Sequence, residues 1–361
     1  GGLQETPQSE EICYTSKATM EDDELIDMIG YAKEIGLRVA LKPTVNCKNG
    51  TWRAHINFFD EDVPCEPKWG NWFASYTAFQ LHYAKIAEQH DCEMFIAGCE
   101  MVMSEHRETE WRRLLSDIRQ VYHGLLSYNT DKYQEHRVKW WDAVDVISSS
   151  GYYPYGDWEN QLDRIEAVVK RFEKPFFFAE TGCMSVKGSM EVPNDWGVKG
   201  DADPDGQAEW YEDMFKACSK RDWVQGMALW SWDAKLYQER SAKSRMDYEI
   251  YAKPAEKVVK KYPNDADNFL KRQARELRKN VVKNVKKDTH TKGATEKSLA
   301  KLKNYKISRI WGYGADRHIE ISAQSPHFHL VERGHNLVIK GKTVKFVAHW
   351  GVLDWVDGLE G

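Results

Sequence analysis

Residues 175–182 have the sequence PFFFAETG. Its first five residues form an apolar run without the polar alternation of a half-exposed strand. Such runs are typical of strands that are buried on both faces, as in a parallel sheet covered by helices. The run ends directly in Glu180, so this strand is expected to carry a carboxylate at its carboxyl end.

Working outward from this strand, other segments repeat the pattern at similar intervals. Strands are expected at residues 37–43, 93–98, 125–129, 145–150, 175–179 and 226–232. Amphipathic helices are expected at residues 20–35, 72–90, 109–122, 158–171 and 207–220, most of them between two strands. This order predicts an α/β fold, and the spacing favours a (β/α)₈ TIM barrel over a doubly wound sheet. No glycine-rich phosphate loop opens any of these helices, which also counts against a dinucleotide-binding fold.

The sequence also predicts where the barrel begins and ends. Only six complete strands are found, and residues 2–6 look like the end of another, so we expect a barrel that lacks its first βα unit at the N-terminus. Between residues 266 and 309, fourteen Lys or Arg stand against four Asp or Glu. This shift predicts a barrel domain over residues 1–263 and a separate basic α+β unit over residues 264–361. In that unit we expect a basic helix at 269–286, a strand at 317–323 and a hairpin at 337–348.

Composition excludes several classes of protein. The 361 residues carry a net charge of −5, with 30% charged and 42% hydrophobic residues, which gives no reason to expect a nucleic acid or membrane partner. The seven cysteines are odd in number and contain no CxxC pair, so neither a disulfide framework nor a zinc site is expected. This cysteine usage and the absence of a signal peptide favour the cytoplasm, although secretion stays open. Most of the fifteen tryptophans are expected in the core.

Two glutamates stand where a barrel places its chemistry. Residues 93–98 run into Cys99 and Glu100, as residues 175–179 run into Glu180. The βα loops open at the carboxyl ends of the strands, and the eighty residues between the glutamates fit strands four and seven. Two carboxylates about 5–5.5 Å apart are what a retaining glycosidase needs, one as nucleophile and the other as acid/base. The alternative is that both are rim glutamates held in structural salt bridges.

Six segments give a more specific expectation. They are residues 36–43 (GLRVALKP), 50–56 (GTWRAHI), 98–101 (GCEM), 151–154 (GYYP), 178–182 (FAETG) and 229–232 (LWSW). Together they resemble glycoside hydrolase family 113, bacterial β-mannanases in a clan of retaining (β/α)₈ glycosidases with xylanase-like relatives, over about residues 3–262. The resemblance implies that Glu100 is the acid/base and Glu180 the nucleophile, acting on a β-linked oligo- or polysaccharide. Many clan members have Asn where Cys99 stands, so recognition of the sugar 2-hydroxyl stays unassigned.

Further residues on the same rim are candidates for positioning and substrate binding. We expect Tyr153 to donate its hydroxyl to Glu180, while Tyr152 could pack inward. Trp230 suits a stacking floor beneath the reactive sugar, with core packing as the alternative. Trp232 is a second stacking candidate, and Trp196 could line a distal subsite.

Polar residues after the third and fifth strands could recognise sugar hydroxyls. The first group is Lys42, Trp52, Arg53 and His55, although a surface salt bridge explains Arg53 nearly as well. Asn129 could bind a substrate hydroxyl or cap a turn. No cluster of ligands suggests an ion, so neither a metal nor a cofactor is predicted.

The C-terminal segment resembles a different class of protein. Residues 269–274 (FLKRQA), 288–293 (DTHTKG) and 325–335 (SPHFHLVERGH) are similar to small tailed-phage neck and tail-completion proteins. The resemblance implies a structural role for His327, His329 and His335, which would also suit a metal. Two alternatives to an active glycosidase follow. One is a catalytically inactive carbohydrate-binding or incomplete barrel fused to a phage module, and the other is an assembly component that oligomerises through this unit.

Overall fold

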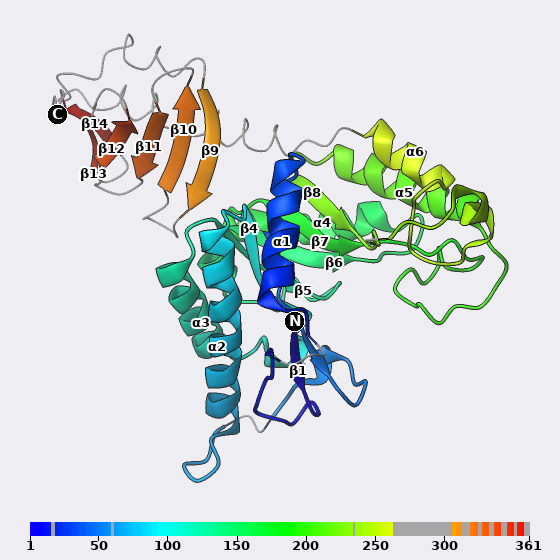
Figure 1. The fold of residues 1–361 in the computed structure, drawn as a ribbon, viewed down its shortest axis with the longest axis horizontal. Helices are drawn as coiled ribbons and strands as arrows, with labels where there is room; N and C mark the ends of the chain where they lie inside the picture. The colour runs from blue at the N-terminus through cyan, green and yellow to red at the C-terminus, as the bar shows by residue number, and fades with distance from the viewer. Residues whose placement is uncertain are drawn as a thin grey trace.

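The central element of the computed structural model is a curled parallel sheet that forms a half-barrel (Figure 1). The structure describes residues 1–15, 19–58, 61–233 and 235–262, and the backbone of six strands between residues 305 and 356. The parallel sheet has the order β2-β4-β5-β6-β7-β8. Its strands are β2 (Ala40–Leu41), β4 (Met94–Cys99), β5 (Leu125–Thr130), β6 (Val146–Gly151), β7 (Phe176–Thr181) and β8 (Val224–Leu229). The six predicted strands and their parallel arrangement are therefore confirmed, although β2 is shorter than expected.

Helices connect most of these strands, as in a (β/α)₈-type barrel. They are α1 (Asp22–Glu34), α2 (Lys68–Gln89), α3 (Glu108–Val121), α4 (Trp158–Phe172), α5 (Pro204–Ser219) and α6 (Pro254–Lys261). The first five match the helices expected from the sequence. None of the described helices combines the length and the apolar content that crossing a bilayer requires.

Burial explains why the strands lack polar alternation. Every residue of β6 is buried, and β4 and β5 each have five buried residues out of six. β8, at one edge of the sheet, is only partly buried. A strand inside a helix-covered parallel sheet meets apolar neighbours on both faces, which removes the reason for a polar face.

Large aromatic side chains fill the space between the sheet and its helices. The indole of Trp111 stacks on Trp140 with ring centroids 4.9 Å apart, and it tilts against the ring of Tyr128 at 4.8 Å. Seven tryptophans are fully buried, namely Trp69, Trp72, Trp111, Trp140, Trp141, Trp158 and Trp210. For these tryptophans the core assignment made from composition is confirmed.

Two further sheets complete the described structure. β1 (Gly2–Gln4) pairs in parallel with β3 (Val45–Cys47), in agreement with the strand end expected at residues 2–6. The second is antiparallel, with the order β14-β13-β12-β11-β10-β9. Its strands are β9 (Tyr305–Trp311), β10 (His318–Ala323), β11 (His327–Val331), β12 (Asn336–Lys340), β13 (Lys345–His349) and β14 (Val352–Val356). β10 and the β12–β13 pair confirm the predicted strand and hairpin, whereas the helix expected at 269–286 lies outside the described residues.

Candidate active site

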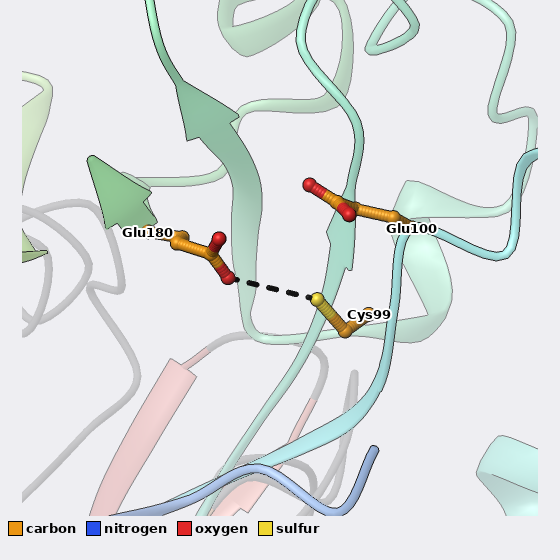
Figure 2. Close-up of side chains that lie close together, drawn as sticks. All are labelled: Cys99, Glu100 and Glu180. Atoms are coloured by element: carbon orange, nitrogen blue, oxygen red, sulfur yellow. Dashed lines mark hydrogen bonds between the residues drawn. The ribbon is translucent and has the colours of Figure 1, made fainter. Parts of the chain in front are cut away.

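The two glutamates singled out from the sequence face each other at the carboxyl ends of β4 and β7 (Figure 2). Glu100 directly follows β4, and Glu180 is the fifth residue of β7. A carboxylate oxygen of Glu100, one of Glu180 and the sulfur of Cys99 all lie within 4.8 Å of one another. The side chain of Glu100 is 10% exposed and that of Glu180 is 15% exposed, so both carboxylates are largely shielded from water but still accessible.

Three donors from different strands hold Glu180, and the most distant is the thiol of Cys99 in β4, whose sulfur lies 3.9 Å from Oε2 (Figure 2). The hydroxyl of Tyr152, after β6, donates to Oε1 at 2.7 Å, and the ammonium of Lys42, after β2, donates to Oε2 at 3.0 Å. Burial would lower the pKa of Lys42, but the acidic groups around its ammonium, Glu180 among them, outweigh burial and raise that pKa. Burial and the neighbouring Glu180 raise the pKa of Tyr152 well above its usual range. Both groups therefore keep the proton that they donate.

The prediction for Tyr153 is wrong. Its hydroxyl donates to Glu135 Oε1 at 3.0 Å, and its ring packs edge-on against Trp158 in the core. Consecutive residues of an extended segment point to opposite sides, so only one of the two tyrosines can face Glu180. Tyr152 is that residue, and the inward packing considered for it belongs to Tyr153.

Three donors hold Glu100. Ser150 Oγ donates to Oε1 at 2.7 Å, while the indole of Trp52 at 3.0 Å and the guanidinium of Arg53 at 3.3 Å reach Oε2. The surface salt bridge considered for Arg53 is instead an ion pair inside the site, because its partner is Glu100. Each glutamate thus has an ion-pair partner, as expected if both were structural rim residues. The two ion pairs lie side by side, however, because the carboxylate oxygens are within 4.8 Å of each other.

Asn129 links a donor of one carboxylate to a donor of the other. It is fully buried, its Oδ1 accepts from Lys42 Nζ at 3.1 Å, and its Nδ2 lies 3.2 Å from Ser150 Oγ. Nδ2 also donates to the carbonyl of Thr130 at 2.7 Å. Both ends of this amide are therefore used inside the protein, so Asn129 neither caps an exposed turn nor lies open on the rim. It orients the donors that reach Glu180 and Glu100.

Cys99, Glu100 and Glu180 form the group that comes closest to a metal site among the described residues. Burial raises the pKa of Cys99 to about 12, so its thiol is protonated near neutral pH, whereas a metal is bound by the thiolate. The ammonium of Lys42 already supplies a positive charge to Glu180. The two glutamates with the protonated thiol of Cys99 and the ammonium of Lys42 therefore form a hydrogen-bonded cluster that does not suit a bound metal cation.

Exposed aromatic rings lie among the remaining candidates. Trp52 is 42% exposed, Trp230 48%, Trp232 57% and Trp196 85%. His55 is also exposed and meets the ring of Trp52 edge-on at 5.8 Å. Core packing, the alternative considered for Trp230, does not fit an indole that is half exposed.

Sequence reasoning missed three side chains of this site. Ser150 and Tyr152 each lie within 2.7 Å of a glutamate oxygen. The run of three serines in a strand expected to be buried was a usable signal for Ser150, because buried hydroxyls need partners. Asp131, after β5, was missed as well, and burial raises its pKa to about 6, with Glu100 adding to that effect.

Comparison with known proteins agrees with this arrangement. The model of glycoside hydrolase family 113 matches residues 1–253. Similar solved structures include a family 113 β-1,4-mannanase and a complex of such an enzyme, each 56% identical with a TM-score of 0.71, covering 72% of this chain and 84% of theirs. A family 113 β-mannanase from Alicyclobacillus acidocaldarius, in complex with ManMIm, is 43% identical with a TM-score of 0.70, covering 72% and 83%. No curated protein matches the chain. The family match ends before residue 266, and the resemblance of the C-terminal segment to phage proteins finds no support.

Proposed function

The chain belongs to glycoside hydrolase family 113, and on this premise we propose that it hydrolyses β-1,4-linked, mannan-type glycans with retention of configuration. The observation that carries the mechanism is the separation of the two carboxylates, whose nearest oxygens lie within 4.8 Å. Retaining glycosidases have carboxyl groups about 5–5.5 Å apart, whereas inverting enzymes need about 6.5–9.5 Å to admit a water molecule. The separation supports a direct attack by one carboxylate.

In this proposal Glu180 is the nucleophile. Its carboxylate attacks the anomeric carbon and forms a covalent glycosyl–enzyme, while the glycosidic oxygen leaves with the proton of Glu100. Lys42 and Tyr152 each donate to a different oxygen of Glu180, so hydrogen bonds hold both ends of the attacking carboxylate. The hydrogen bond from Tyr152 to Oε1 is separate from the ion pair of Lys42 with Oε2. It therefore helps to fix the orientation of the Glu180 carboxylate.

Glu100 is the acid/base, first protonating the leaving oxygen and then taking a proton from the attacking water. Its Oε2 accepts from two groups that only donate, Trp52 and Arg53. Its Oε1 instead faces the hydroxyl of Ser150, which can donate to a carboxylate and accept from a carboxylic acid. This partner supports a role in which Glu100 gains and loses a proton in each cycle.

The substrate assignment rests on the relatives and on the rim of the site. The three similar structures are named as β-mannanases and are 43% to 56% identical to this chain. We propose that Trp230 and Trp232 stack on sugar rings, whose axial C–H bonds match an aromatic face. His55, with Lys42, Trp52 and Arg53, would contact hydroxyls on the other side of the carboxylates.

Product stereochemistry on a panel of substrates tests this function. The purified protein is incubated with β-mannan, xylan and β-glucan oligosaccharides, and the first anomer released is followed by NMR. We expect cleavage of the mannan oligosaccharides with release of the β anomer. Release of the α anomer would contradict the nucleophile, preferred cleavage of xylan would contradict the substrate, and no cleavage would leave an inert carbohydrate-binding barrel. Glu191 is an exposed glutamate in the loop after β7, and Glu191→Ala is the control variant, which should give the same products as the wild type.

We also propose that the glycosidase unit covers residues 1–263. The family match ends at residue 253, and α6 ends at Lys261. Limited proteolysis followed by mass spectrometry tests this boundary. A stable fragment that ends near residue 263 is expected, and a stable fragment that includes the antiparallel sheet would contradict it.

A further inference from the structure

The backbone of Glu100 has an unusual conformation. Its φ is +54°, in the left-handed region that residues with a Cβ atom rarely adopt. The pairing of β4 with β5 also shifts register between Ile96 and Cys99, immediately before this residue. Such conformations are unfavourable and persist only where the surroundings enforce them, most often at functional sites. Some part of the structure must therefore hold this turn.

Two consecutive amides of the turn are fixed by β5. The N–H of Glu100 donates to the carbonyl of Asn129 at 2.7 Å, and the N–H of Met101 donates to the hydroxyl of Tyr128 at 3.0 Å. The ring of Tyr128 also packs beneath the turn, because a Cβ atom added to Gly98 would lie 3.3 Å from it. Tyr76 and Trp111 also lie close to Gly98, and Tyr128 adds to this packing a hydrogen bond with the Met101 amide.

A buried carboxyl group sets the direction of the Tyr128 hydroxyl. This hydroxyl donates to Glu105 Oε1 at 2.8 Å, and the hydroxyl of Thr130 donates to the same oxygen at 2.5 Å. A hydroxyl has one proton, so donation to Glu105 leaves its lone pairs to accept from the Met101 amide. Glu105 is buried and has no ion-pair partner within the described part of the chain. Burial raises its pKa to about 8, so it acts mainly as a neutral acceptor near neutral pH.

We infer that Tyr128 and Glu105 are a positioning pair, which holds the left-handed turn at Glu100 and thereby aims its carboxyl group at the glycosidic oxygen. Both side chains are buried, and they act on Glu100 through the Met101 amide and not by contact with the reacting atoms. The inference rests on the proposed role of Glu100 as acid/base. It predicts that loss of the pair damages proton transfer more than it damages nucleophilic attack.

Leaving-group dependence separates these two effects. Tyr128→Phe removes the hydroxyl and keeps the ring, and kcat/KM is measured on phenyl and dinitrophenyl β-manno-oligosaccharides. The phenolate needs a proton to leave and the dinitrophenolate does not. We expect kcat/KM to fall about 10- to 100-fold for the phenyl substrate, the range for a misplaced catalytic group, and by less than about 3-fold for the dinitrophenyl substrate. Equal losses on both substrates, or no loss on either, would overturn the inference.

Matched variants separate positioning from general loss of stability. Tyr122→Phe also removes one buried tyrosine hydroxyl, which donates to the carbonyl of Cys92 at 2.8 Å near the opposite end of the strands. It should lower the melting temperature as Tyr128→Phe does, without a difference between the two substrates. Glu105→Leu should reproduce the Tyr128→Phe pattern. Glu105→Gln keeps an acceptor oxygen for Tyr128 and should recover most of the activity that Glu105→Leu loses.

A structural measurement keeps the inference distinct from the proposed function. In a crystal structure of Tyr128→Phe we expect Glu100 to leave the left-handed region or its carboxyl group to lose the contact with Ser150. An unchanged turn together with an intact contact between Glu100 and Ser150 overturns the positioning role, whatever the activity. A wild-type protein that cleaves neither aryl substrate overturns the proposed function, and the crystal structure then decides the positioning by itself.

Discussion

The two halves of the site are built differently. We call Glu100 with its partners Trp52, Arg53 and Ser150 the Glu100 corner, and Glu180 with Lys42 and Tyr152 the Glu180 corner. The Glu100 corner is supported by β4 to β6, which are almost wholly buried, and by the buried Tyr128–Glu105 pair. The Glu180 corner lies beside β8, which is only partly buried, and the half-exposed Trp230 follows that strand.

This difference corresponds to two tasks. A group that moves a proton twice in each cycle depends on an exact direction, and a rigid aromatic core supplies one. A nucleophile also needs free space in front of it for the sugar, and an open edge with exposed indole rings supplies that space. The contrast predicts that the two corners respond differently to substitution.

The largest effect is expected in the Glu180 corner. Glu180→Ala removes the group that forms the covalent intermediate, so kcat on mannan oligosaccharides should fall by roughly 10⁴-fold or more. Initial rates with the purified variant measure this loss, and thermal melting shows whether the barrel is intact. Retention of full activity in a correctly folded variant would contradict the assignment.

A smaller loss with a distinctive rescue is expected in the Glu100 corner. Glu100→Ala removes acid/base catalysis, which contributes about 10²- to 10⁴-fold. Azide should restore turnover of a dinitrophenyl glycoside, because a small anion can attack the glycosyl–enzyme in the space left by the side chain. Rescue of Glu180→Ala instead of Glu100→Ala would mean that the roles are exchanged.

The buried support of the Glu100 corner should also make stability depend on pH. Burial raises the pKa of Glu105 to about 8 from an ordinary value of 4.5, so between these values the folded protein holds a proton that the unfolded chain releases. The free energy of unfolding should therefore fall as pH rises through this window, by up to about 1.4 kcal/mol per pH unit. Urea denaturation of wild type and Glu105→Gln measures it, and identical slopes in both proteins would contradict the expectation.

The smallest effect is expected at the open edge. Trp230→Ala should raise KM for mannan oligosaccharides several-fold, because one stacked aromatic ring contributes about 0.5–1.5 kcal/mol. Trp196→Ala, which changes another exposed indole, provides a comparison for a distal position. An unchanged KM in Trp230→Ala would remove Trp230 from the proposed subsite.

The sequence by itself determined the parallel sheet and the placement of the two glutamates. Apolar runs such as residues 175–179 have no polar face, so they can only be buried between helices, and the residue after each run must then lie at the open end of the barrel. Glu100 and Glu180 were found in this way without any knowledge of their partners. Lys42, Trp52 and Arg53 were also expected on this rim, and each reaches one of the two carboxylates.

Only the tertiary structure decided which partners hold each carboxylate. The choice between Tyr152 and Tyr153 depends on where β6 ends, because a shift of one residue turns a side chain to the opposite face. Ser150 reaches Glu100 across β5, and Tyr128 supports it through a turn whose left-handed backbone no local pattern predicts. Such contacts join residues that are far apart in the chain, so their geometry is fixed by the register and twist of the sheet and not by the residues themselves.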